Sequence, residues 1–230
     1  MKRRDFGQYC GLARALELVG ERWALLIVRD LSVQPQRYTD LLNGLPGIPT
    51  NVLSTRLKEL EEANLVERRI APAPQRGVLY ALTPVGRDLE PAILALGLWG
   101  AGQLEEPRPG DIVTPGSVTL SLRGVFDPEA AAGLTASWEI RSPDMVLHAV
   151  VTDGRLDAGV GPSPGRPDLV ITFDPDGLAS YRALMRAAKC GLVELDGPPA
   201  LLDTFISVFP LPRNDTRNDT RTTAGLAEQN

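Results

Sequence analysis

Residues 49–63 read PTNVLSTRLKELEEA and predict an amphipathic helix that begins at a proline. Leu53, Leu57 and Leu60 fall at i, i+4 and i+7 on one face. The opposite face carries amide, hydroxyl and cationic side chains in its first half and glutamates in its second half. A recognition helix inserts its N-terminal end into the DNA major groove, where such donors meet bases and phosphates. The candidate contacts of this helix are Thr50, Asn51, Ser54, Thr55, Arg56 and Lys58.

The segments around this helix predict a winged helix-turn-helix domain. Three helices are expected before it, at about 8–19, 21–31 and 38–45, and the second is apolar nearly all round, which is typical of a domain centre. Two strands are expected after it, at 66–70 and 78–82, joined by an arginine-bearing turn that would bring cations to the DNA backbone or minor groove. The remaining candidate contacts are Arg37, Arg68, Arg69 and Arg76. The alternative is an ordinary small helical domain with a solvated charged hairpin.

A long helix is expected from Thr83-Pro84 to about Leu104. Residues 92–99 have no polar face, so one small domain cannot cover them on all sides. We interpret this helix as a dimer interface, with packing against a second domain as the alternative. The candidate dimer residues are Tyr9, Leu12, Ile93, Leu94, Leu96, Leu98 and Trp99.

Composition indicates a globular chain of one to two domains, with 230 residues, 43% hydrophobic and 23% charged. Two cysteines and one histidine, His148, exclude a disulfide framework and zinc sites built from four thiolates or a histidine pair. We expect no metal and no cofactor. No apolar run is long enough for a membrane span and no signal-peptide core follows Met1, so we expect a cytoplasmic protein.

The net charge of −5 is unevenly distributed. Residues 1–106 hold 13 Lys and Arg against 13 Asp and Glu, whereas residues 107–212 hold 8 against 13. Any contact with DNA is therefore expected from the first region. We expect domains over 1–106 and 107–212, and a disordered polar tail over 213–230.

The second region predicts an α+β domain with a mostly antiparallel sheet covered by helices. From Gly116 onward apolar and polar residues alternate, first at 118–122 and then at 136–140 and 145–151, and Asp153-Gly154 predicts a hairpin turn before 156–160. Another strand is expected at 169–173, and helices are expected at about 176–189 and 198–209. The fold class is therefore α+β, with an N-terminal winged helix-turn-helix domain and this C-terminal domain.

Residues 8–104 resemble the HxlR-type, MarR-like winged-helix transcriptional regulators. That resemblance implies a dimeric DNA-binding regulator. Two departures are Gly11, where the family usually has proline, and Gly77, where it usually has arginine before the second strand. The matching motifs are 10–16, Gly20-Glu21-Arg22-Trp23, Arg37-Tyr38-Thr39, Leu45-Pro46-Gly47-Ile48, Leu53-Ser54-Thr55-Arg56-Leu57, Leu60-Glu61, Leu65-Val66-Glu67-Arg68 and 80–86.

Residues 114–212 resemble the SCP2-like sterol-carrier domain. The matching segments are 146–158, 167–173, 178–185, 191–197 and the last apolar helix. The resemblance implies an apolar cavity for a hydrophobic small-molecule effector. A filled core has the same apolar sequence, so that alternative stays open. The candidate lining residues are Trp138, Leu147, Ala149, Ile171, Phe173, Leu178, Tyr181, Met185, Leu201 and Phe205.

Two functional alternatives accompany the regulator hypothesis. Cys10 is a redox candidate, because a helix N-terminus and Arg14 favour the thiolate, but it is also a small side chain suited to a dimer contact. The chain could instead be a lipid-type carrier whose helical domain mediates protein association. The sequence offers no specific constellation of catalytic residues, so we do not expect an enzyme.

Overall fold

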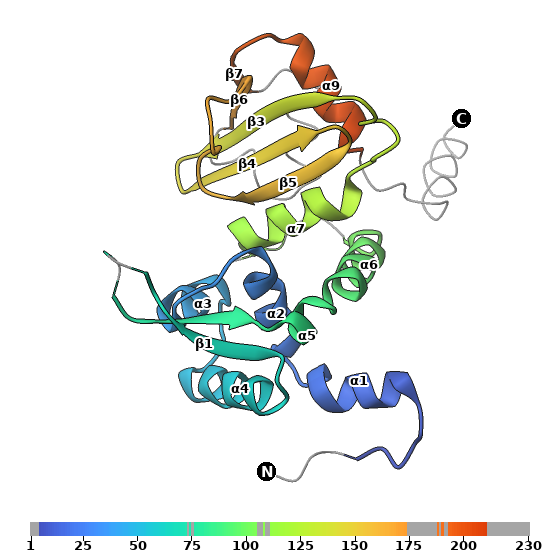
Figure 1. Cartoon of the computed structure of the whole chain (residues 1–230), viewed down its shortest axis with the longest axis vertical. Coiled ribbons are helices and arrows are strands. Elements are labelled where there is room, and N and C mark those ends of the chain that lie inside the picture. Colours follow the sequence, from blue (N-terminus) through green and yellow to red (C-terminus); the bar gives the residue numbers. More distant parts are fainter. Residues whose placement is uncertain are drawn as a thin grey trace, which may run out of the picture.

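The computed structural model describes residues 5–72, 74, 76–104, 108, 111–173, 188, 190 and 193–210 (Figure 1). The first part of the chain forms α1 (Gly11–Val19), α2 (Ala24–Val33), α3 (Tyr38–Gly44), α4 (Thr50–Glu62), β1 (Val66–Ile70) and β2 (Val78–Leu82). Each of these elements lies where the sequence pattern predicted it, within a few residues. The two strands pair antiparallel, from Val66 opposite Leu82 to Ile70 opposite Val78.

The core of the first part lies between α2 and α4. Ile27, Val28 and Leu31 of α2 are buried, although Leu26 on the same helix is 40% exposed. The leucine stripe of α4, which ends at Leu60, is fully buried against them. Each fully buried leucine stabilises the fold by roughly 2 kcal/mol, so this stripe fixes the orientation of α4.

The prediction of a single long helix after Thr83 is wrong, because the chain forms two helices there. They are α5 (Pro84–Arg87) and α6 (Glu90–Ala101). Pro91 lies in the first turn of α6. A proline there lacks the N–H that a continuous helix would need and its ring would clash with the preceding turn. The helix therefore restarts at Glu90.

The strand predicted at 118–122 is also wrong. These residues belong to α7 (Pro115–Val125), which Thr114 caps by accepting the Ser117 N–H at 3.1 Å. Proline at the first helical position suits this start. Val118, Leu122 and Val125 are buried and lie at i, i+4 and i+7, the spacing of one face of a helix. The alternation of apolar and polar residues at 118–122 had indicated a strand instead.

The second part is a five-stranded sheet of order β5-β4-β3-β6-β7. Its strands are β3 (Thr135–Ser142), β4 (Met145–Thr152), β5 (Arg155–Val160), β6 (Leu169–Thr172) and β7 (Glu194–Asp196), and α9 (Ala200–Val208) follows them. Three strand pairs are antiparallel, and β3 pairs parallel to β6. The predicted Asp153-Gly154 turn is confirmed, since both residues have positive φ.

Some expectations lie outside the described residues. They are the helix at 176–189 apart from Ala188, the tail at 213–230, and the candidate lining residues Leu178, Tyr181 and Met185. No helix in the described part of the chain is long and apolar enough to cross a membrane.

Helix α7 lies between the two parts and contributes to both cores (Figure 1). Leu120 packs in the core of the first part, whereas Val118, Leu122 and Val125 pack under the sheet. The two parts are therefore joined by a shared helix as well as by the chain between α6 and α7.

Candidate nucleic-acid interface

The outer face of α4 is open to solvent. Thr50, Asn51, Ser54, Thr55 and Lys58 are all exposed. The helix lies at the end of the molecule away from the five-stranded sheet (Figure 1). The polar first half of α4 is therefore accessible to a large partner.

Tyr38 of α3 holds the first turn of α4. Its hydroxyl donates to Thr50 O at 2.7 Å and lies 3.1 Å from Ser54 Oγ. Ser54 and Thr55 also donate to carbonyls one turn earlier, at 3.0 and 2.8 Å. These hydroxyls can still accept hydrogen bonds from a partner. The sequence motif contained Tyr38, but no pattern indicated this positioning role.

Arg56 does not belong to the exposed face. Its side chain is 11% exposed and forms ion pairs with Glu59 and, at 3.8 Å, with Glu21. The helical position of Arg56 places it beside the buried stripe rather than opposite it. Of the two cations expected on α4, Lys58 is the exposed one, with 74% of its side chain accessible, and it forms a long ion pair of 3.9 Å with Glu62.

The arginines of the β1–β2 hairpin differ in their partners. Arg68 Nε donates to Glu61 Oε1 at 2.7 Å and stacks on Tyr80, and the bond to Glu61 raises the pKa of Arg68 further. Arg69 pairs with Glu67. Arg76 is exposed at the turn, and no carboxylate of the described residues pairs with it.

Arg37 fixes the turn that carries Arg76. Its Nη1 donates to Arg76 O at 2.8 Å. Gly77 has φ +124°, and a Cβ there would lie 2.6 Å from Arg37 Nη1. The glycine that departs from the family pattern therefore makes room for Arg37, which supports the hairpin from α3.

The candidate dimer residues divide among three surroundings. Tyr9 just before α1, Leu12 on α1, and Leu96 and Trp99 on α6 are exposed, and both helices lie along the same side of the molecule (Figure 1). Ile93 is buried in the core of its own chain, so it is not an interface residue. Leu94 and Leu98 approach α7, where a Cβ on Gly124 would meet both at 3.6 Å.

Cys10 is exposed at the residue that caps the N-terminus of α1. The backbone amides of Ala13 and then Leu12 lower the pKa of its thiol. Arg14 pairs with Glu17 at 2.9 Å. The helix terminus therefore favours the thiolate, while the expected contribution of Arg14 is directed to a carboxylate instead.

Six of the candidate cavity residues, on β3, β4 and α9 and at or just after β6, are buried side chains. Trp138, Leu147, Ala149, Ile171, Phe173 and Phe205 are all at most 2% exposed. Phe205 packs against Trp138 and Phe209 with ring centroids 5.8 and 4.7 Å apart. Both a filled core and an enclosed apolar cavity require these side chains to be buried, so their role as lining residues stays a prediction.

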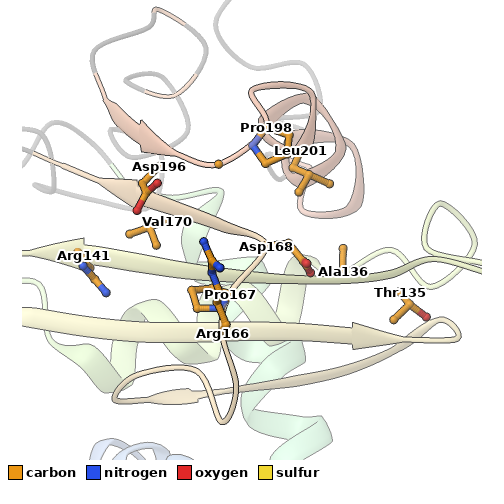
Figure 2. A pocket seen from close by; sticks show the side chains of 11 residues that line it. Thr135, Ala136, Arg141, Arg166, Pro167, Asp168, Val170, Asp196, Pro198 and Leu201 are labelled. Carbon is orange, nitrogen blue, oxygen red and sulfur yellow. The ribbon is translucent and has the colours of Figure 1, made fainter.

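A pocket of about 680 Å³ opens beside that core, between β3, the 166–168 turn, β6 and the start of α9 (Figure 2). Leu201 is the only candidate among the described residues that lines it. Trp138 Nε1 donates to Leu201 O at 2.9 Å and so holds this wall in place. The charged lining side chains are Arg141, Arg166, Asp168 and Asp196.

Two contacts position the turn that carries Arg166. Asp168 Oδ2 accepts from Ser137 N and Oγ at 2.8 and 2.7 Å. The buried Glu139 accepts from Ser163 N at 2.9 Å and from Arg141. Burial raises the pKa of Glu139, but these two bonds and the charges of Arg141 and His148 outweigh it and leave that pKa below its usual value. Within the described residues no cluster of three or more His, Cys, Asp or Glu is arranged to hold a metal ion.

Comparison with known proteins identifies the first part of the chain. A family model described as HxlR-like helix-turn-helix matches residues 18–108. An HTH-type transcriptional regulator of Synechocystis is 32% identical over 102 residues, which is 44% of this chain and 76% of that protein. YodB, an HTH-type transcriptional regulator of Bacillus subtilis, is 37% identical over 99 residues, which is 43% of this chain and 86% of YodB.

A Mycobacterium bovis regulator is 45% identical over 97 residues, so this chain spans 61% of its length. The structure of quinone-bound YodB matches 39% of this chain at 31% identity, with a TM-score of 0.34. The family model ends at residue 108 and leaves the sheet and α9 unmatched. On the relatives from Synechocystis and Bacillus subtilis, the chain belongs to the HxlR-like helix-turn-helix family of transcriptional regulators.

Proposed function

We propose that this protein is a dimeric transcriptional regulator that reads DNA with the first half of α4. The observation that carries the proposal is the open polar face of that helix, which has donors at Thr50, Asn51 and Lys58 and no cover from the described chain. Amide, hydroxyl and ammonium groups in this arrangement match the base edges and phosphates of a major groove. The glutamates of its second half lie outside the proposed contact.

Phosphate contacts are proposed for Lys58 and Arg76. Both side chains are exposed, and cations at such positions attract the DNA backbone in a salt-dependent way. Arg68 and Arg69 form closer ion pairs with glutamates, at 2.7 and 2.5 Å, than Lys58 forms with Glu62 at 3.9 Å, so DNA would have to displace a closer carboxylate to engage them. Arg37 acts through the turn that it supports.

The proposed dimer interface combines α1 and α6. Trp99 is 67% exposed and Leu96 is 50% exposed, next to each other on a helix with no polar face. A monomer rarely leaves such a surface uncovered, and a second copy offers the same surface for a symmetric contact. Two recognition helices would then face successive major grooves.

The second part is proposed to bind a small-molecule effector. Its pocket of about 680 Å³ is within the size range of ligand sites and combines apolar walls with fixed charged groups. This pocket differs from the apolar cavity that the SCP2-like resemblance implies, because charged side chains line part of it. Cys10 is a second proposed input, since its thiol is exposed and its pKa is lowered.

The experiment selects duplexes from random DNA with the full chain and measures their binding by fluorescence anisotropy. We expect binding that survives excess unrelated duplex and weakens with salt. Thr55→Glu should abolish it, because a carboxylate on the α4 face repels phosphate. The control is Thr204→Glu, since Thr204 makes the same hydrogen bond to the carbonyl four residues earlier, but on α9.

Failure to enrich any duplex would overturn the regulator proposal. Native mass spectrometry of the freshly purified chain then tests the carrier alternative, which requires a hydrophobic molecule to co-purify. If Thr55→Glu and Thr204→Glu lost DNA binding equally, the proposal that α4 contacts DNA would be wrong.

A further inference from the structure

Helix α7 is a structural part of the DNA-binding domain although it follows the chain segment between the domains. Leu120 is 8% exposed within the first core, and Gly116 and Gly124 face α2 and α6. The opposite side of α7 lies under β4 and β5 (Figure 1). A displacement of the sheet therefore acts directly on α2.

Arg123 ties α7 to three other elements. Its Nε and Nη2 donate to Ala158 O of β5 at 3.2 and 2.8 Å. Its Nη1 donates to Ser32 O of α2 at 3.1 Å and to Glu90 Oε1 of α6 at 3.0 Å. One guanidinium group thus joins the sheet of the second part to the end of α2.

The buried carboxylate of Asp30 lies at the same joint. Asp30 is 3% exposed, and a Cβ on Gly116 would lie 2.6 Å from its Oδ1. Arg29 binds Oδ1 at 2.8 Å, while Oδ2 has no hydrogen-bond partner among the described residues. The carboxyl group faces the first turn of α7, and burial raises its pKa although the charge of Arg29 and its hydrogen bond oppose that rise. Close backbone approach at Gly116 leaves no space for a larger residue.

The end of α2 leads directly to the β1–β2 hairpin. Gln36 Nε2 donates to Asp30 O at 3.0 Å. The backbone of Gln36 exchanges two hydrogen bonds with Tyr80 of β2, at 3.0 and 2.8 Å. The next residue, Arg37, binds the carbonyl of Arg76. Taken in order along the molecule, these contacts form a continuous path from β5 to the β1–β2 hairpin.

We propose that Arg123 is a positioning residue for DNA binding, which sets the hairpin from the second domain through Ser32, Gln36 and Arg37. The inference rests on the proposed DNA-binding function. It gives the second domain a physical route to the DNA contact, since any movement of β5 against α7 changes the support of the α2 end. Arg123 itself lies outside the proposed contact face.

The test measures binding of the full chain to a selected duplex for Arg123→Ala, Arg76→Ala and the double variant. We expect Arg123→Ala to weaken binding roughly two- to thirty-fold, the range for residues along a coupling network. Because Arg123 acts through the hairpin, the double variant should bind no more weakly than the weaker single variant. Arg155→Ala is the control, because Arg155 is an exposed arginine of β5 and makes none of the described contacts at the joint.

A second measurement separates positioning from loss of folding. Hydrogen exchange of the free chain should accelerate at the Gln36 and Tyr80 amides in Arg123→Ala but not along α4. Arg123→Lys keeps the charge without the forked donors and should give an intermediate effect. If Arg123→Ala unfolds the protein, as tryptophan fluorescence would report, Arg123→Lys carries the same expectations.

Three outcomes would overturn the inference. They are unchanged DNA affinity, losses that multiply in the double variant, and exchange that accelerates equally in α4. Absence of DNA binding by the unaltered chain would instead overturn the proposed function, while the exchange experiment would still report on the joint.

Discussion

The outer face of α4 and the inner face of β3 represent opposite uses of side chains. Asn51 and Thr55 on α4 are exposed, polar and unnecessary for packing, whereas Trp138 and Ile140 on β3 are buried and apolar. Under the proposed function, substitution on the first surface should change recognition at little cost in stability. Substitution on the second changes stability without directly touching a partner. An exposed polar face therefore supports a proposal about a contact surface, while buried apolar residues indicate only a core.

The largest expected effect comes from the core of the second domain. Phe205→Ala removes a fully buried ring that contacts Trp138 and Phe209, so the free energy of unfolding should fall by about 3–5 kcal/mol. Urea unfolding followed by fluorescence measures this loss. Leu12→Ala, on a 68% exposed side chain, is the control and should change little. A loss below about 1 kcal/mol for Phe205→Ala would favour a ligand cavity over a filled core.

The exposed surface of α6 should give the next largest effect. Trp99→Ser removes a large aromatic side chain from the proposed dimer interface and should weaken dimerisation by about 2 kcal/mol or more. Sedimentation at several protein concentrations measures the dissociation constant. Trp99 is exposed in the single chain, so the fold should persist. A dimer of unchanged affinity would place the interface elsewhere.

Asn51 tests the recognition role of α4. Asn51→Ala should cost about 1–3 kcal/mol of discrimination at one base position in each half-site, because an amide can bind a base edge with two hydrogen bonds. Anisotropy with a set of single-base substitutions in the selected duplex measures it. Thermal stability should stay the same, since Asn51 is exposed. An unaltered base preference would exclude Asn51 from readout.

Loss of the exposed Arg76 and loss of the internally paired Arg56 should change the salt dependence of DNA binding differently. Arg76→Ala should weaken binding to every duplex and reduce the slope of log K against log salt by about one per protomer, as a phosphate contact does. Arg56→Ala should leave that slope unchanged, because Arg56 pairs with Glu59 and Glu21 within the protein. Equal reductions in both variants would contradict the assignment of Arg56 to an internal role.

Cys10 should show the smallest effect, in the pH dependence of alkylation. The backbone amides of Ala13 and Leu12 lower its pKa, so the thiolate forms at lower pH than in an ordinary thiol. In a Cys190→Ser background, the alkylation rate should reach half its maximum below the ordinary value of about 8.5. A midpoint at or above that value would remove the basis for a redox role.

The parts of the fold that the sequence predicted correctly depend on local patterns that are compatible with only one structure. The leucine stripe of α4, the strands at 66–70 and 78–82, and the Asp153-Gly154 turn were all predicted, because spacing and turn chemistry constrain them locally. The split at Pro91 also carried a local signal, since a proline inside an apolar helix interrupts it.

The remaining features depend on distant contacts. The alternation of apolar and polar residues at 118–122 fitted a strand. Only Thr114-Pro115, a capping residue followed by a proline, indicates that a helix begins there. Arg56 matched a DNA contact in type, but Glu21, 35 positions earlier, forms part of its environment. The positions of Asp30 and Arg123 depend on the packing of α2 against α7, which no local sequence pattern predicts.

The most direct test of the α4 assignment maps where the helix lies on DNA. Glu62→Cys places a thiol at the exposed end of α4 beside the proposed contacts, in a chain with Cys10→Ser and Cys190→Ser, and an iron chelate on that thiol cleaves nearby DNA. We predict cleavage confined to each half-site of the selected duplex, and none from the same chelate on Asp203→Cys of α9. A bound duplex left intact by the α4 probe, or cut by the α9 probe, would contradict the account.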